Sequence, residues 1–178
     1  MRNRNLELIM LGLTVTTPLS ITVKAEVYFS EDQVVKSIFP DETFQSQWIE
    51  LTDAEVKSIE EKSGERVRDR KVRVWKSSSG NIVFIDRVIG KHDYITYAVG
   101  INKTGKVAQI EVMEYRETYG EDVRKPLWRQ QFVGKTDSDP LKVNHDIKNI
   151  SGATLSSTHL TAGVRRILQT YENVKTKS

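Results

Sequence analysis

Four hydroxyl side chains occur within the seven-residue segment SGATLSS, residues 151–157. An apolar helical pattern begins directly after it, so the hydroxyls lie where a helix has unpaired N–H groups and the positive end of its dipole. Hydroxyl oxygens accept hydrogen bonds from such N–H groups and cap the helix. The same N–H groups beside a glycine also bind phosphate. The segment is therefore either a helix cap or a phosphate site, formed by Ser151, Gly152, Ala153, Thr154, Leu155, Ser156 and Ser157.

The pattern after this segment predicts one long C-terminal helix. Apolar side chains recur at helical spacing over three turns, at Leu160, Val164, Ile167, Leu168 and Tyr171. Arg165 and Arg166 lie off this apolar stripe.

The middle of the chain predicts an antiparallel sheet. Residues 71–74 alternate charged and apolar side chains, and a Ser-Ser-Ser-Gly turn connects them to the apolar residues 82–88. A second pair, residues 94–101 and 107–115, flanks an Asn-Lys-Thr-Gly turn. Two hairpins are therefore expected.

Two shorter helices are predicted before this sheet. Ser30 caps the first, which ends before Pro40. Thr52 followed three residues later by Glu55 forms a capping box for the second, which ends at Gly64. The predicted fold class is α+β: an antiparallel sheet packed with helices, with the last helix following the hydroxyl-rich segment.

Residues 1–25 have the pattern of a cleaved secretory signal peptide. Arg2 and Arg4 precede an apolar run, and Ala25 offers a small residue at the exit. The alternative is a retained membrane anchor, but the run is interrupted by threonines and Pro18 and is shorter than the roughly 20 residues of a spanning helix. We therefore expect an exported protein, with a lead-in over residues 26–90 and a cofactor domain over residues 91–175.

Composition excludes several classes of partner and chemistry. Beyond residue 25 the chain has 24 Lys and Arg against 23 Asp and Glu, in mixed order, so no nucleic-acid partner is expected. Cysteine is absent from the sequence, which removes disulfides, thiolate nucleophiles and cysteine-bound clusters. Redox chemistry would require a bound cofactor.

The segment DIKNISGATLSS, residues 146–157, resembles the flavin-attachment sequence of the FMN-binding domain family, in which Asp, a short spacer and Ser or Thr precede Gly-Ala-Thr. In that family, a flavin transferase uses FAD and magnesium to join FMN to the closing threonine through a phosphoester. The resemblance places this bond at Thr154. Members include flavin subunits of sodium-pumping NADH:quinone oxidoreductase and of Rnf-type complexes, and small exported electron carriers.

The resemblance extends over residues 94–171. Gly100 and Gly105 match a hairpin of the family, the segment Glu-Thr-Tyr-Gly at residues 117–120 resembles its Glu-Thr-Pro-Gly, and Trp128 precedes a matching Phe-Val-Gly. The chain departs from the pattern in two places. Tyr119 replaces the proline, and four residues separate Asp146 from Ser151 where the short form of the pattern has two.

Four further residues become candidate cofactor contacts through the resemblance. Glu117 and Thr118 are expected near the polar edge of the flavin ring or its ribityl chain, and Trp128 with Leu155 near the ring face. A structural role in the core is the alternative for Trp128. Asp146 either brings magnesium or orients the threonine hydroxyl during modification, or it forms a turn before the helix.

Other catalytic motifs lack support. His145 and Asp146 resemble half of a metal-dependent dyad, but the remaining histidines lack ligand spacing, and no Gly-x-Ser-x-Gly elbow is present. The resemblance implies an electron-transfer protein or redox subunit rather than a stand-alone enzyme. It would be periplasmic, modified by a flavin transferase, and partnered with a membrane flavocytochrome or oxidoreductase complex. The rival hypothesis is an exported, non-redox binding module that holds a phosphorylated ligand reversibly or uses the motif only as a helix cap.

Overall fold

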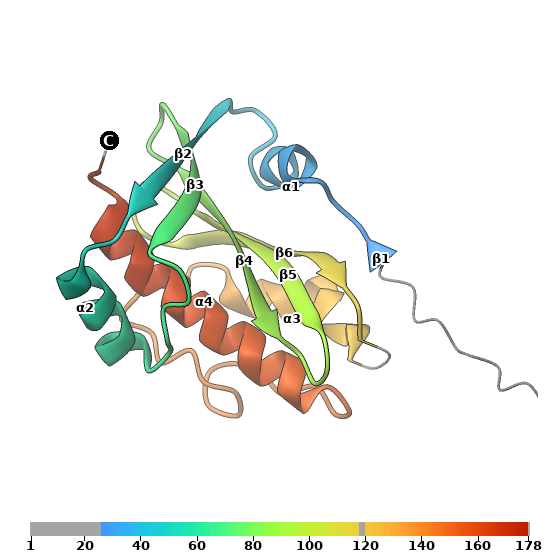
Figure 1. Cartoon of the computed structure of the whole chain (residues 1–178). Coiled ribbons are helices and arrows are strands. Elements are labelled where there is room, and N and C mark those ends of the chain that lie inside the picture. The colour runs from blue at the N-terminus through green and yellow to red at the C-terminus, as the bar shows by residue number, and fades with distance from the viewer. Residues whose placement is uncertain (1–25, 118–119, 178) are drawn as a thin grey trace, which may run out of the picture.

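The computed structural model of this protein describes residues 26–117 and 120–177 (Figure 1). The predicted signal peptide at residues 1–25 and the candidate contact Thr118 lie outside the described residues.

One antiparallel sheet of six strands, in the order β1-β6-β5-β4-β3-β2, organises the chain. The strands are β1 Glu26–Val27, β2 Phe44–Glu50, β3 Lys71–Ser77, β4 Ile82–Ile89, β5 Tyr94–Ile101 and β6 Val107–Tyr115. Both predicted hairpins, β3–β4 and β5–β6, are confirmed. The sheet is continuous across residue 90, the predicted boundary between the two parts of the chain, because β4 pairs with β5 along eight residues.

The sequence did not predict β1 or β2. The first contains only two residues and pairs with the end of β6. The second, FQSQWIE, lacks strict alternation of apolar and polar side chains, and its place at the sheet edge leaves most of it exposed. Its pairing with β3 over seven residues defines it as a strand.

The two N-terminal helices begin as predicted. Helix α1, Glu31–Ile38, has a capping box between Ser30 and Gln33. Helix α2, Asp53–Ser63, has a second one between Thr52 and Glu55 and ends at Gly64 in the left-handed conformation. In both helices, the cap hydroxyl accepts a hydrogen bond from the backbone N–H of the third helical residue. The side chain of that third residue accepts one from the backbone N–H of the cap residue, so the local sequence determines the helix start.

Helices cover both faces of the sheet, which confirms the α+β class (Figure 1). Helix α4, Thr154–Val174, crosses one face and contributes Leu160, Val164 and Leu168 to the larger core. Helix α1 covers part of the other face with a smaller core around Val34 and Ile38. The short helix α3, Pro126–Arg129, lies between two 3₁₀ turns, Glu121–Arg124 and Gln130–Phe132. In the described residues no helix has the length and apolarity needed to cross a membrane.

Arg166 lies off the apolar stripe of α4 but is buried. Arg166 is only 8% exposed, and its guanidinium pairs with the Asp86 carboxylate of β4. The hydroxyl of the buried Tyr97 donates to the same carboxylate at 3.1 Å. The buried charge of Arg166 is tolerated because it is paired with the Asp86 carboxylate, which also accepts the hydrogen bond from Tyr97. Asp86 and Arg166 line a cavity between β3 and β4, where the two strands pair at only three positions in the part of the chain that is described.

Candidate functional site

A cavity of about 480 Å³ lies where the start of α4 meets the turn between β4 and β5. Its walls come from three separate parts of the chain: the turn, the segment following β6, and the hydroxyl-rich segment. In Figure 1 the β4–β5 turn and the first turn of α4 lie at the same end of the molecule. The lining residues are Lys91, His92, Glu117, Gly152, Ala153, Thr154, Leu155 and Ser156. Six of the predicted site residues are therefore brought together.

The backbone before α4 forms a tight turn. The Ala153 N–H donates to the Ile150 carbonyl at 3.0 Å, and Gly152 lies inside this turn with a φ of +81°. This left-handed conformation is strained for residues with a side chain, which explains the glycine. Ala153 directly precedes the helix, and its carbonyl accepts a hydrogen bond from the Ser157 N–H at 2.9 Å.

The alternative that the hydroxyls cap α4 does not hold in the described residues. Ala153 occupies the cap position, and within the described part of the chain no side-chain hydrogen bond caps α4. Ser156 is buried and bonds the Tyr115 hydroxyl at 3.1 Å, while Ser157 donates to the Ala153 carbonyl at 2.9 Å. These two serines are engaged in the interior. The positive end of α4 therefore faces the cavity without a side-chain acceptor, which is the arrangement that favours an anion.

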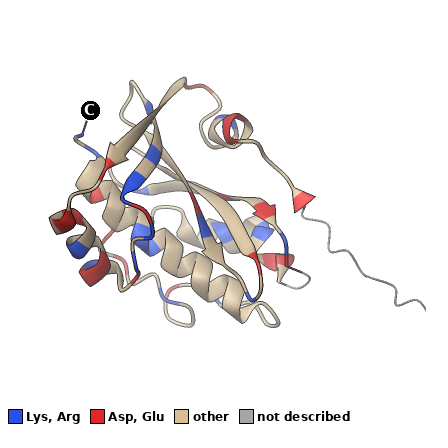
Figure 2. Ribbon diagram, in the orientation of Figure 1, with Lys and Arg blue, Asp and Glu red and all other residues tan. Residues whose placement is uncertain are grey.

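Thr154 differs from Ser156 and Ser157 because it is exposed, at the first position of α4. Its Oγ1 accepts a hydrogen bond of 3.2 Å from the side-chain amide of Asn149. Leu155 beside it is 46% exposed, which leaves an apolar surface at the cavity wall. Figure 2 shows that charged residues of both signs are interspersed over the elements, whereas the first turns of α4 have none.

Glu117 shapes the opposite wall of the cavity. Its Oε1 accepts hydrogen bonds from three successive N–H groups of the β4–β5 turn: those of Lys91, His92 at 2.6 Å and Asp93 at 2.9 Å. A side chain at Gly90 would collide with this carboxylate, since a Cβ there would lie 2.5 Å from Oε1. The carboxylate is thus committed to the turn, and it positions Lys91 and His92 at the cavity.

The hydrogen bonds to Glu117 give stability a pH dependence. Burial works to raise the pKa of this carboxyl, but the three N–H donors and the nearby charge of His92 outweigh it and hold the pKa below its ordinary 4.5. The folded protein thus binds this proton less readily than the unfolded chain. The resulting stabilisation is present above pH 4.5 and is lost as the pH falls through the lower, folded value.

We expect Glu117→Gln to remove this contribution. Urea unfolding of the wild type and of the variant, measured from about pH 7 to about pH 3, should give a difference in free energy that shrinks toward acid. Other carboxylates titrate in both proteins and cancel in the difference. Glu61→Gln, at an exposed site of α2 paired only to Lys57 among the described residues, serves as the control. A difference that stays constant with pH would contradict the prediction.

Trp128 lies outside the cavity, in the larger core. It is 6% exposed, packs edge-on against Phe132 at a centroid distance of 5.1 Å, and donates from Nε1 to the Lys148 carbonyl at 2.8 Å. The spacing of these two aromatic residues did indicate a shared face. These contacts favour the structural alternative for Trp128, which anchors the segment leading to α4.

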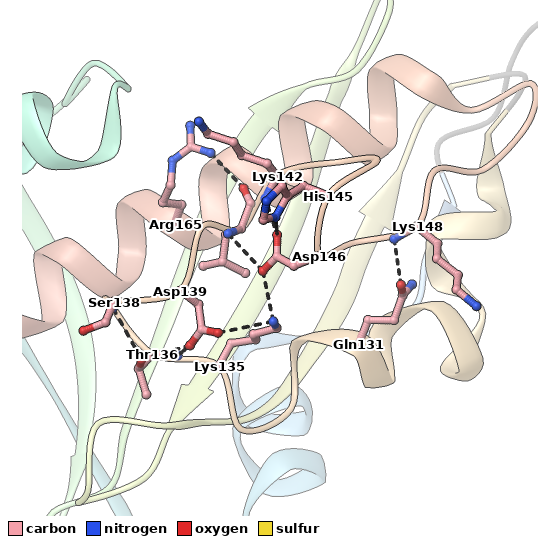
Figure 3. A network of polar contacts seen from close by, with 11 residues as sticks. Gln131, Lys135, Thr136, Ser138, Asp139, Lys142, His145, Asp146, Lys148 and Arg165 are labelled. Carbon is pink, nitrogen blue, oxygen red and sulfur yellow. Dashed lines mark hydrogen bonds and ion pairs between the residues drawn. The ribbon is translucent and has the colours of Figure 1, made fainter.

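Asp146 also lies outside the cavity, within a network of polar contacts (Figure 3). Its carboxylate accepts from Lys135 Nζ at 2.9 Å and from the N–H groups of Lys142 at 2.8 Å and Leu141 at 3.2 Å. Arg165 reaches from α4 to the Leu141 carbonyl at 2.8 Å. The carboxylate thus closes the loop and fastens it to the rest of the domain, which favours the structural alternative. The described residues contain no group of three or more His, Asp or Glu suited to a metal ion.

Sequence reasoning missed three residues of the site: Lys91, His92 and Asn149. The first two belong to a Gly-Lys-His-Asp turn, recognisable as a turn between two strands. Nothing in the sequence connects that turn with the start of a helix about 60 residues later. Asn149 lies just before the hydroxyl-rich segment, but its side-chain direction depends on the loop fold.

Comparisons with known proteins agree with this location. Residues 90–169 match the FMN-binding domain family. A segment of the chain is also 30% identical over 84 residues to one subunit of the Na(+)-translocating ferredoxin:NAD(+) oxidoreductase complex of Acetobacterium woodii, covering 42% of this chain and 41% of that protein. The chain thus spans less than half the length of this relative. The cavity residues from Lys91 to Ser156 all fall inside the matched range. Residues 90–169 are therefore similar to the FMN-binding domain family.

Proposed function

We propose that this protein is an exported flavoprotein that carries FMN on Thr154 through a phosphoester and transfers electrons between a membrane redox partner and an acceptor. The observation that supports the attachment best is the exposed Thr154 hydroxyl at an uncapped helix start, inside a cavity of the FMN-binding domain. Ser156 and Ser157 are buried and bonded elsewhere, so they are poorer acceptors for a phosphoryl group.

The residues present suit a flavin phosphate. The N–H groups of the first turn of α4 and the helix dipole stabilise an anion attached at Thr154. Lys91 adds a positive charge at the cavity wall, and the exposed Leu155 offers an apolar surface to a flat ring. Glu117 contributes indirectly, because it fixes the turn that bears Lys91 and His92.

Attachment requires a transfer reaction. The Thr154 oxygen forms a bond to the FMN phosphorus of FAD, the pyrophosphate bond breaks, AMP leaves, and the hydroxyl proton passes to a base of the flavin transferase. Magnesium, supplied with the transferase, would neutralise the pyrophosphate charge. When bound, FMN supplies one- and two-electron redox chemistry, and the protein determines its position. A covalent bond prevents loss of the cofactor from an exported protein.

The proposed partner rests on the relative and on the sequence pattern of the N-terminus. The relative is named as a subunit of an oxidoreductase complex, and a membrane complex of this kind or a flavocytochrome is the partner we propose. Residues 1–25 have the pattern of a signal peptide, which supports export to the periplasm.

The decisive experiment is co-expression with and without a flavin transferase. With it, the secreted protein should remain fluorescent after denaturing electrophoresis, and its intact mass should increase by one FMN less one water. Without it, the polypeptide should have its unmodified mass. Flavin that dissociates on denaturation would support the rival binding module, and a colourless product despite active transferase would refute the proposal.

A further inference from the structure

Asn149 makes the one side-chain contact that the described structure records for the Thr154 hydroxyl. Its Nδ2 donates to Thr154 Oγ1 at 3.2 Å. The neighbouring hydroxyls have other partners: Ser156 bonds Tyr115, and Ser157 bonds the Ala153 carbonyl. The hydrogen bond from the Asn149 amide thus distinguishes Thr154 from Ser156 and Ser157.

The other end of the same amide is unsatisfied. Asn149 Oδ1 is buried and has no hydrogen-bond partner among the described residues. A buried acceptor without a partner is unfavourable, and a residue kept only for packing would avoid it. Stability alone therefore does not explain an asparagine at this position, and its hydrogen bond to Thr154 suggests another role.

The backbone around Asn149 is fastened on both sides. The preceding residue, Lys148, donates its N–H to Gln131 at 2.7 Å and accepts from Trp128 Nε1 at 2.8 Å, as Figure 3 shows in part. The following residue, Ile150, accepts the Ala153 N–H. These contacts hold the backbone on both sides of Asn149, and its amide already donates to Thr154 Oγ1 before any modifying enzyme arrives, which lowers the cost of orienting the hydroxyl.

We propose that Asn149 is a positioning residue for flavin attachment: it selects Thr154 and stabilises the charge that develops on Oγ1. This inference rests on the proposed phosphoester at Thr154. As Oγ1 bonds to the FMN phosphorus of FAD and its proton leaves for the base of the transferase, negative charge builds on that oxygen before AMP departs. An N–H donor already aimed at the oxygen stabilises this charge without reorganisation. Because the amide donates, the hydroxyl proton stays available for removal.

The test measures the rate of flavin incorporation into purified apoprotein with transferase, FAD and magnesium. Asn149→Ala removes the donor, whereas Asn149→Asp has nearly the same shape but only accepts when ionised. For both variants we expect the maximal rate to fall roughly 10- to 100-fold. The KM for the protein substrate should change less than about twofold, because the contact acts on the reacting oxygen and not on docking. Thr158→Ala, an exposed threonine one turn further along α4, is the matched control and should keep the wild-type rate.

Each result has a distinct meaning. Wild-type rates in both Asn149 variants would overturn the inference, and so would a change in KM alone. A normal rate in Asn149→Asp with a slow Asn149→Ala would show that the residue acts as an acceptor and would also overturn it. A wild-type protein that takes up no flavin would refute the proposed function instead. Thermal melting checks that the variants fold. If Asn149→Ala does not fold, Asn149→Asp still tests the inference.

Discussion

Thr154→Ala is expected to abolish covalent flavin while leaving the domain folded. The substitution removes the hydroxyl proposed to bear the phosphoester, and no other motif hydroxyl is both exposed and held by an amide. The cost to folding is small because Thr154 does not cap α4. Loss of the bond from Asn149 costs about 1 kcal/mol, and the better helix propensity of alanine offsets part of it. Intact mass and in-gel fluorescence after co-expression with the transferase measure the first effect, and urea unfolding measures the second.

The control for this experiment is Thr158→Ala, which makes the same chemical change one helical turn away at an exposed position. It should keep one FMN per chain. Flavin that remains bound to Thr154→Ala through denaturation would contradict the site assignment. Peptide mapping would then show which hydroxyl carries it, with Ser151 the exposed candidate within the motif.

The sequence predicted those elements whose signals are local. The capping boxes at Ser30 and Thr52 appear in the structure as complete pairs of hydrogen bonds, and both hairpins lie where two-residue periodicity placed them. These features depend on neighbours in the chain. The edge strand β2 lacks such a pattern, and its pairing with β3 defines it.

The site was predicted in part for the same reason. The motif located Thr154, but the partner of Ser156 comes from a distant segment: it is Tyr115 of β6. The helix-cap alternative fails because Ala153, at the end of a turn closed on Ile150, takes the position that a hydroxyl residue would need. Glu117, expected near the flavin, lines the cavity, and its carboxylate is committed to three N–H groups. Tertiary contacts thus decide which polar groups remain available for a ligand.

Trp128→Ala is expected to lower the free energy of unfolding by about 3–5 kcal/mol, as for other large aromatic residues removed from a core. The substitution leaves a void against Phe132 and removes the donor to the Lys148 carbonyl. Because Lys148 precedes Asn149, the segment before α4 loses an anchor at the same time. Urea unfolding monitored by circular dichroism measures the loss, and Leu127→Ala, at the adjacent but 82% exposed position, should change stability little.

Trp128→Phe separates the core role from contact with the flavin ring. Phenylalanine keeps most of the apolar contact but cannot donate to Lys148, so stability should fall by about 1 kcal/mol. If Trp128 acts only through the core, the absorption spectrum and fluorescence yield of the bound flavin stay at wild-type values. A tryptophan stacked on the ring would quench the flavin, and its replacement would raise the fluorescence several-fold. That rise would contradict the placement of Trp128 in the core and would require the loop of residues 141–153 to rearrange when FMN is attached.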